Sequence, residues 1–273
     1  MDIIRPLHPL LQPYIDFFYF SPSIGGPASY VAFPHVNTCL SFFRNCQITI
    51  NEDEIEIGTT VAGNNNICAF ITGRYTYPVY VRYSAPIQEI AIVFKPLGLQ
   101  HFIDHPTRQV HSGAGAAFEE KNWLSMAATL VDGNDANYVV DQLEAFLVQQ
   151  FRQTDLTAMY TALLLLADTE EDHTINELAK ASAMSRKTLE RHFLKELGCT
   201  PASYRRILRF RRSVDLGLIK KEIGQLTAIA YDAQYYDQSY FIREYKKLTH
   251  SNPKAFFERI RTFEANKIVW MPK

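Results

Sequence analysis

Residues 185–197 of the sequence, SRKTLERHFLKEL, place polar and apolar side chains at the period of an α-helix. Leu189 and Phe193 lie one turn apart and define the side that we expect to be buried. The opposite side carries Lys187, Glu190 and Arg191. Such groups on a helix can read base edges in the major groove of DNA, and arginine can donate two hydrogen bonds to guanine O6 and N7. An ordinary solvated helix face is the alternative.

A second stretch, residues 237–248, DQSYFIREYKKL, has the same organisation. Phe241 and Tyr245 form the expected buried pair. The outward side carries Ser239, Tyr240 and Arg243. One helix of this kind is usually a solvated amphipathic surface. Two helices with an arginine at the equivalent position favour the same function for both, which is the recognition of base edges.

The two stretches belong to an internal repeat. The pair Leu178-Ala179 matches Ile229-Ala230 at an offset of 51 residues. Further along, an offset of 52 relates the pairs Leu189/Phe241, Arg191/Arg243, Phe193/Tyr245 and Pro201/Pro253. One extra residue has therefore entered the second copy between its two helices, where a turn tolerates insertion.

Each copy predicts a helix, a short turn and a second helix. Thr174 followed by Glu177 is a capping box, and Ser185 caps the next helix, with Gly198 just past its end. Asp237 stands where Ser185 stands in the first copy. We therefore predict two helix-turn-helix motifs, whose second helices, at about 185–197 and 237–248, lie in major grooves.

Residues 201–218 contain Pro only at their start and predict one connecting helix of about 27 Å. Successive major-groove faces repeat every ~34 Å, so a connector of this length can hold both second helices on one side of a duplex. Its candidate phosphate partners are Arg205, Arg206, Arg209, Arg211 and Arg212. A surface salt bridge is the alternative for each of them, with Asp215 as a partner for Arg209 or Arg212. Around the two second helices, the predicted phosphate contacts are Ser185, Arg186, Thr188, Lys246 and Lys247.

Charge is divided unevenly along the 273 residues, although the net charge is only -1. Residues 1–169 hold 8 Lys or Arg and 16 Asp or Glu, whereas residues 170–262 hold 18 Lys or Arg and 12 Asp or Glu. A basic region beside an acidic one indicates that only the basic region meets a polyanion; chance variation in surface charge is the alternative.

The acidic half begins as a β-rich region. Strands are predicted at 39–43, 47–51, 67–72, 79–83 and 89–94, with Gly, Pro and Asn between them. This spacing indicates a small antiparallel sandwich or barrel, and we interpret residues 51–58, NEDEIEIG, as a solvated β-turn. Helices are predicted at 119–132 and 136–151, and another begins near Leu156. Expected core aromatics, some of which could line a ligand pocket, are Phe33, Phe42, Phe43, Phe70 and Phe94.

Several classes of protein are disfavoured by the sequence. It contains no long uncharged apolar run and no secretory signal, so we expect a cytoplasmic protein without a membrane span. The four cysteines show no metal-like spacing and are expected to be reduced and buried. His101 and His105, with His111 nearby, are a candidate metal pair, but surface histidines are the simpler reading, so we predict no metal and no cofactor. No catalytic motif appears, so we do not expect an enzyme.

The segments ELAKASAMSRKTLERHFLKELGCTPASY and IAYDAQYYDQSYFIREYKKLTHSNPKAFF resemble the two helix-turn-helix motifs of the AraC/XylS family of bacterial transcription regulators. The resemblance covers about 170–260 and implies a seven-helix domain that binds adjacent major grooves and regulates transcription. Carried over by position, it implies base contacts by Lys187, Glu190, Arg191, Gln238, Ser239, Tyr240 and Arg243. The sequence departs from the family at Ala183, Gln234 and His250, where family members usually have Gly.

Residues 1–150 resemble, more weakly, the β-rich amino-terminal domain of part of the same family, through YVAFPHVNTCLSF and EIAIVFKPLGLQHFI. In the family such domains bind a small effector, dimerise, or both. The expected architecture is therefore α+β: a β-rich effector-binding or dimerisation domain with carboxyl-terminal helices at 1–152, an all-α DNA-binding domain at 155–262, and a tail at 263–273.

The leading hypothesis is a DNA-binding regulator of the AraC type that associates with the bacterial nucleoid when bound. Its expected partners are double-stranded DNA, a second copy of the chain, a small-molecule effector, and RNA polymerase if it activates. The alternatives are an architectural or protein-interaction module and a β-barrel enzyme fused to a DNA-targeting domain. The sequence identifies no effector-binding residue.

Overall fold

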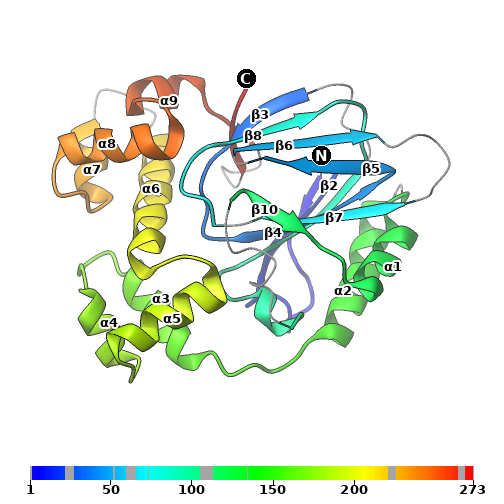
Figure 1. The fold of residues 1–273 in the computed structure, drawn as a ribbon, viewed down its shortest axis with the longest axis horizontal. Helices are drawn as coiled ribbons and strands as arrows, with labels where there is room; N and C mark the ends of the chain where they lie inside the picture. The colour runs from blue at the N-terminus through cyan, green and yellow to red at the C-terminus, as the bar shows by residue number, and fades with distance from the viewer. Residues whose placement is uncertain are drawn as a thin grey trace. The chain divides into compact units, whose positions relative to one another are not determined.

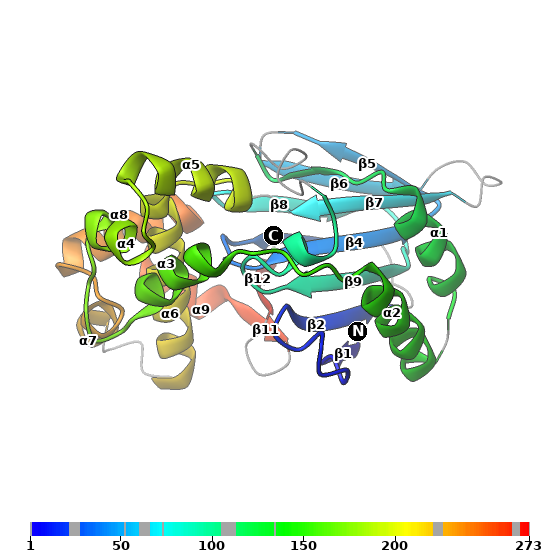
Figure 2. The same cartoon turned by 90° about the horizontal axis from the view of Figure 1, so that it is seen from below.

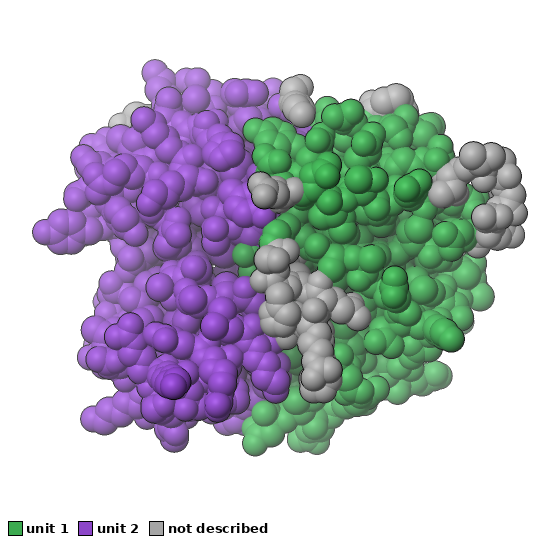
Figure 3. Space-filling view, in the orientation of Figure 1, with its two compact units in different colours: residues 1–29, 37–74, 80–155 green, residues 30–36, 75–79, 156–273 purple. Residues whose placement is uncertain are grey.

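A computed structural model describes residues 2–21, 28–51, 53–59, 66–72, 74–104, 113–133, 135–220, 226–263 and 268–272. The chain divides into two compact units, which Figure 3 colours separately. Unit 1 holds residues 1–29, 37–74 and 80–155, and unit 2 holds residues 30–36, 75–79 and 156–273. The predicted fold class, a β-rich amino-terminal part followed by helices with two helix-turn-helix motifs, is confirmed.

In the part of unit 1 that the structure describes, the first sheet is antiparallel and has six strands in the order β1-β2-β9-β4-β7-β10. Its strands are β1 (Asp2–Ile4), β2 (Ile15–Ser21), β4 (Thr38–Arg44), β7 (Ile67–Thr72), β9 (Glu89–Phe94) and β10 (Gly115–Ala117). Strand β9 lies between β2 and β4, and all six of its residues are buried. The predicted strands at 39–43, 67–72 and 89–94 are thereby confirmed.

A further ladder of unit 1 contains β5 (Cys46–Ile50), β6 (Glu54–Thr59) and β8 (Val79–Tyr83). Strands β5 and β6 are antiparallel, but β6 and β8 are parallel, so the expectation of a wholly antiparallel structure is wrong. The interpretation of residues 51–58 as a solvated turn is also wrong, because Ile55 and Ile57 of β6 are only 5% and 3% exposed. Neighbouring acidic residues hid this period-two pattern.

Helices α1 (Lys121–Leu130) and α2 (Ala136–Gln150) pack on the first sheet. Trp123 of α1 and Leu143 of α2 join the same buried cluster as Phe42 and Ile92. The Trp123 and Phe42 rings stack at 6.4 Å between centroids, and Figures 1 and 2 show both helices at one end of the sheet. The two predicted helices are confirmed, and their role in covering the sheet follows from this packing.

A buried acid, Glu89, lies inside unit 1. Tyr19 donates a hydrogen bond of 2.6 Å to one carboxyl oxygen and Tyr83 donates one of 3.1 Å to the other. Burial raises the pKa of Glu89, against the opposing effect of these hydrogen bonds and one with Ser41. Burial likewise raises the pKa of Cys39 to about 12, so this thiol is a poor nucleophile.

The remaining sequence predictions for unit 1 concern its cysteines and histidines. All four cysteines of the chain are thiols rather than disulfides; Cys46 and Cys199 are buried as expected, whereas Cys39 and Cys68 are half-buried. His101 is 3% exposed, so the expectation of a surface histidine is wrong for it. His105 and His111 lie outside the described residues. Within the described ranges, no group of three His, Cys, Asp or Glu side chains could hold a metal ion.

The described residues of unit 2 form the seven helices that the family resemblance implied. They are α3 (Thr157–Ala167), α4 (Ile175–Ala181), α5 (Arg186–Leu197), α6 (Pro201–Lys220), α7 (Leu226–Asp232), α8 (Gln238–Thr249) and α9 (Pro253–Arg259). Figure 1 shows α6 running between the pair α4 and α5 at one end and α7 to α9 at the other. The predicted connector is therefore a single continuous helix.

An aromatic core holds the second half of unit 2 together. The Tyr245 ring lies 4.6 Å from Phe241, 5.3 Å from Phe210 and 5.3 Å from Phe256, centroid to centroid. All four side chains are completely buried. The prediction that Phe241, Tyr245 and Phe256 are core residues is confirmed.

Two short pieces of the β-rich sequence, residues 30–36 and 75–79, also belong to unit 2. Arg211 of α6 donates hydrogen bonds of 2.9 Å to the Phe33 carbonyl and 2.6 Å to the Pro34 carbonyl. Phe33 packs on Phe256 at 4.9 Å. Strand β12 (Ile268–Pro272) pairs with β3 (Ala28–Ala32) and with β11 (Arg261–Phe263). Because Arg211 is occupied in this way, it holds the chain together within unit 2.

Candidate nucleic-acid interface

The first helix-turn-helix motif, residues 174–197, is built by local capping. Thr174 accepts a hydrogen bond of 3.2 Å from the Glu177 backbone, and Glu177 accepts one of 2.6 Å from the Thr174 backbone. The predicted capping box is therefore confirmed. Ser185 accepts from the Thr188 backbone at 3.1 Å and begins α5, and Gly198 ends it in the left-handed conformation at φ 69°.

The second motif, residues 226–249, repeats these contacts. Asp237 accepts a hydrogen bond of 2.6 Å from the Tyr240 backbone and caps α8, as predicted. Its turn is closed by Tyr235 N donating to Ala230 O at 2.9 Å. The equivalent bond in the first motif runs from Met184 N to Ala179 O at 2.8 Å.

These matched bonds identify the inserted residue. Met184 and Tyr235 correspond at an offset of 51, whereas the caps Ser185 and Asp237 correspond at an offset of 52. The extra residue is therefore Tyr236, whose side chain is 92% exposed. An exposed turn residue accommodates the insertion without disturbing either helix.

Three positions where family members usually have Gly have positive φ in this chain. Ala183 has φ 53°, Gln234 has φ 60° and His250 has φ 53°. The turns thus keep the backbone that Gly would provide, at a cost of about 1 kcal/mol for each residue with a Cβ. The departures in sequence change the side chains at the turns but leave the turn conformation in place.

The buried sides of α5 and α8 are as predicted. Leu189 and Phe193 of α5, and Phe241 and Tyr245 of α8, have no exposed area. Most of the predicted base-reading side chains lie on the surface: Lys187, Arg191, Gln238, Ser239 and Arg243 are exposed, while Glu190 and Tyr240 are half-buried. Arg243 lies over the Tyr240 ring at 5.9 Å from its centroid, a position that orients the guanidinium.

The predicted phosphate-contacting residues at the two helices differ in their surroundings. The Ser185 and Thr188 hydroxyl groups lie 2.9 Å apart, and Arg186 forms an exposed ion pair of 3.0 Å with Glu190. In α8, Lys246 is exposed and Lys247 lies 3.4 Å from Glu244. Both lysines are in the last turn of α8, where a positive charge also complements the helix dipole.

The connector arginines have partners within unit 2. Arg206 pairs with Glu244 of α8 at 2.6 Å, and Arg209 pairs with Asp172 at 2.6 Å rather than with the Asp215 considered from sequence. Arg205 lies 3.3 Å from Asp172 and also donates to the His173 carbonyl. Burial lowers the pKa of Arg205, and Asp172 opposes this effect. A phosphate contact by these three arginines stays a prediction.

Glu244 is a residue that the sequence reasoning missed. Its side chain is only 4% exposed, although it carries a charge in the middle of α8. The available signal was its position, one residue before Tyr245 and three after Phe241 on the buried side. A charge at such a position requires a cation close by, which Arg206 supplies.

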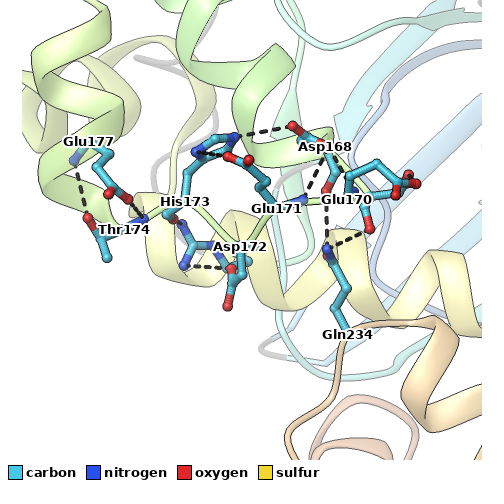
Figure 4. A network of polar contacts seen from close by, with 10 residues as sticks. Asp168, Glu170, Glu171, Asp172, His173, Thr174, Glu177 and Gln234 are labelled. Carbon is cyan, nitrogen blue, oxygen red and sulfur yellow. Dashed lines mark hydrogen bonds and ion pairs between the residues drawn. The ribbon is translucent and has the colours of Figure 1, made fainter.

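The loop between α3 and α4, residues 168–173, was also missed. Asp168 accepts backbone hydrogen bonds from Glu170 at 2.8 Å and from Glu171 at 3.4 Å, and His173 lies 3.2 Å from its carboxylate. These hydrogen bonds, first that from Glu170 and then that with His173, lower the pKa of Asp168. Figure 4 shows this network together with Gln234 of the second motif. A cavity of about 90 Å³ adjoins the loop, and Arg205, Arg209 and Gln234 help to line it.

Comparisons with known proteins place the second motif and most of the first in a known family. Residues 178–259 match the family model described as a helix-turn-helix domain, which is of the AraC type. A search of curated proteins gave no match. Among the described helices, none is long and apolar enough to cross a membrane.

Solved structures of ToxT from Vibrio cholerae are similar to this chain. One, at 1.65 Å resolution, is 14% identical, with a TM-score of 0.47, and the match covers 88% of this chain and 98% of that chain. Another, of ToxT with bound unsaturated fatty acid, is 16% identical, also with a TM-score of 0.47, and covers 88% of this chain and 94% of that chain.

Two capped helix-turn-helix motifs, a continuous connector helix and the family match agree in their location on the chain. They point to DNA binding rather than to catalysis. Residues 178–259 therefore carry a helix-turn-helix domain of the AraC type, which supports a DNA-binding transcription regulator.

Proposed function

We propose that α5 and α8 read base edges in adjacent major grooves of one operator. The observation that carries the proposal is the equivalence of Arg191 and Arg243, which are both exposed on helices with equivalent caps and equivalently placed buried pairs. Arginine can form two hydrogen bonds with guanine. The other proposed base contacts are Lys187 and Glu190 on α5 and Gln238, Ser239 and Tyr240 on α8.

Phosphate contacts are proposed to set the position of each helix on the duplex. At the start of α5 these are Ser185, Arg186 and Thr188, and at the end of α8 they are Lys246 and Lys247. Arg205, Arg206 and Arg209 of the connector would reach phosphates only by exchanging or sharing their present carboxylate partners. We therefore expect these three to contribute less than the exposed lysines of α8.

Unit 1 is proposed to bind a small effector or to form a homodimer. The β-rich architecture of unit 1 supports a separate sensing role. In such a regulator, effector binding changes the affinity for DNA, and RNA polymerase becomes a partner if the protein activates transcription. The proposed effector-binding and dimerisation region is 1–152, and the proposed DNA-binding region is 155–262.

The test begins with selection of bound duplexes from a random pool by the full chain. We expect two short boxes about one helical turn apart, 10–10.5 base pairs from centre to centre. Arg191→Ala and Arg243→Ala should each weaken specific binding by about 1–3 kcal/mol and relax the sequence preference in one box. Arg259→Ala, at an exposed arginine of α9, is the matched control.

Binding to random duplexes separates this proposal from an architectural role. The DNA affinity of a regulator and that of an architectural protein both depend steeply on salt concentration. Only a regulator has an affinity for its selected site that exceeds its affinity for random DNA by a factor of about a thousand or more. Lys246→Ala and Lys247→Ala should weaken binding to all sequences about equally. Unchanged box preferences in both arginine variants would contradict the assigned reading helices.

A further inference from the structure

The loop of residues 168–173 links the two helix-turn-helix motifs through side-chain contacts. It joins α3 to α4 and so leads directly into the first motif. Gln234, in the turn of the second motif, donates from Nε2 to the carbonyls of Asp168 at 3.3 Å and Thr169 at 3.1 Å. Figure 4 shows the Gln234 side chain pointing at this loop. A residue of one motif thus contacts the chain that enters the other.

The loop is also fixed to the connector helix. Asp172 is held by Arg209 at 2.6 Å and by Arg205 at 3.3 Å, and Arg205 donates to the His173 carbonyl. Within the loop, hydrogen bonds to the Asp168 carboxylate fix the backbone whose carbonyls face Gln234. The loop is therefore held in its shape by contacts other than the one with Gln234.

Gln234 has the same backbone conformation as its counterpart Ala183, with φ 60° against 53°. This left-handed conformation favours Gly, and neither residue gains from its Cβ in the turn. Ala183 has no polar side-chain atom, whereas Gln234 reaches the loop with its amide. Gln234 therefore adds a contact at a turn where backbone conformation alone would favour Gly.

We infer that Gln234 is a positioning residue that fixes the second reading helix relative to the first and so determines which spacing between boxes is bound tightly. This inference rests on the proposed function, two helices reading one operator. Two boxes are bound at once only if the helices have the correct rotation and separation. Loss of the contact widens the range of arrangements, so binding to the selected spacing weakens while binding to one box does not.

The sharpest variant is Gln234→Glu, which keeps the size and the backbone preference of the side chain but removes the donating N–H groups. Gln234→Gly is the second variant, because it suits the positive φ and lacks the side chain. Ala183→Gly is the matched control, since it makes the same backbone change in the turn without a contact to lose. Far-UV circular dichroism verifies that every variant is folded.

Each variant is titrated with three sets of duplexes: the selected two-box site, the same site with one or two base pairs inserted or removed between the boxes, and sites with one box scrambled. A net hydrogen bond changes an equilibrium constant about two- to tenfold. We therefore expect both Gln234 variants to reduce the preference for the selected spacing about tenfold. Ala183→Gly should retain this preference. On sites with one box scrambled, the affinity of each variant should differ little from that of the wild type.

The ratio of affinities for selected and shifted spacing cancels general effects of charge or stability. An unchanged ratio in both Gln234 variants, with a clear two-box preference in the wild type, would overturn the positioning role alone. A wild type that binds one box as tightly as two would overturn the proposed function and the positioning role together. The two failures are therefore distinguishable in the same experiment.

Discussion

The two helix-turn-helix motifs share their local design but differ in how each is held in unit 2. In the first, α5 buries Leu189 and Phe193, and its ion pair between Arg186 and Glu190 lies on the surface. In the second, α8 packs into an aromatic cluster and carries a buried acid, Glu244, that pairs with the connector helix.

This difference shows that the two copies share the capped helix and its outward arginine rather than the packing beneath the helix. The first motif is held by its caps and by the packing of a small apolar face on α3 and α6. The second depends on residues more than thirty positions away, since Arg206 and Glu244 are 38 residues apart and Ser213 and Tyr245 are 32 apart. Substitutions at equivalent positions should therefore have unequal effects.

The largest difference is expected at the two ion pairs. Arg206→Met leaves the Glu244 carboxylate, only 4% exposed, without its closest cation, so we expect the free energy of unfolding to fall by about 3 kcal/mol. Arg186→Met removes a solvent-exposed pair and should cost only about 0.3–0.5 kcal/mol. Urea denaturation followed by circular dichroism measures both. Adding Glu244→Leu to Arg206→Met should recover stability, and equal losses in the two single variants would remove the contrast.

The helix caps should instead give equal effects in the two motifs. Ser185→Ala and Asp237→Ala each remove a side-chain oxygen that accepts a backbone hydrogen bond, at a cost of about 1 kcal/mol. Asp237→Asn keeps an accepting oxygen and serves as the control. Thermal melting of the three variants measures the losses. A cost at Asp237 well below that at Ser185 would show that packing, and not the cap, positions α8.

The two turns should respond to Gly with opposite signs. Ala183→Gly relieves a positive φ and should raise the free energy of unfolding by roughly 0.5–1 kcal/mol. Gln234→Gly gains the same relief but loses two hydrogen bonds to the loop, so we expect no gain or a small loss. Parallel urea titrations compare the two variants. A gain of similar size from both would mean that the Gln234 amide adds nothing to stability.

The smallest effect is expected from acid on the first motif. The backbone hydrogen bond with Thr174 and the contact with its hydroxyl lower the pKa of Glu177 below its usual 4.5. Because the folded pKa is the lower one, the capping box stabilises α4 above the unfolded pKa, and this contribution is lost as the pH falls through the folded pKa. Nuclear magnetic resonance titration of Glu177 and of the α4 amides measures the loss. Glu177→Gln should remove this pH dependence, and an unchanged acid response of α4 in that variant would contradict the prediction.

The sequence predicted the second unit more fully than the first. Caps at Thr174, Ser185 and Asp237 act within four residues, so the order of amino acids alone reveals them. The change in offset from 51 at Leu178 and Ile229 to 52 at Leu189 and Phe241 likewise marked an insertion between the two helices of the second copy. In unit 1, β6 was missed because Ile55 and Ile57 stand among acidic residues, and no local signal shows that β6 and β8 run parallel.

Taken alone, the order of amino acids determined the two capped helices, their buried pairs and the equivalent arginines, because each depends on contacts within one or two helical turns. Only the tertiary structure decided that Glu244 is buried against Arg206, that Arg211 holds Phe33 and Pro34, and that Gln234 reaches Asp168. These contacts join residues 38 to 178 positions apart. Local spacing carries no information about such pairs, since they form only when separate elements pack together.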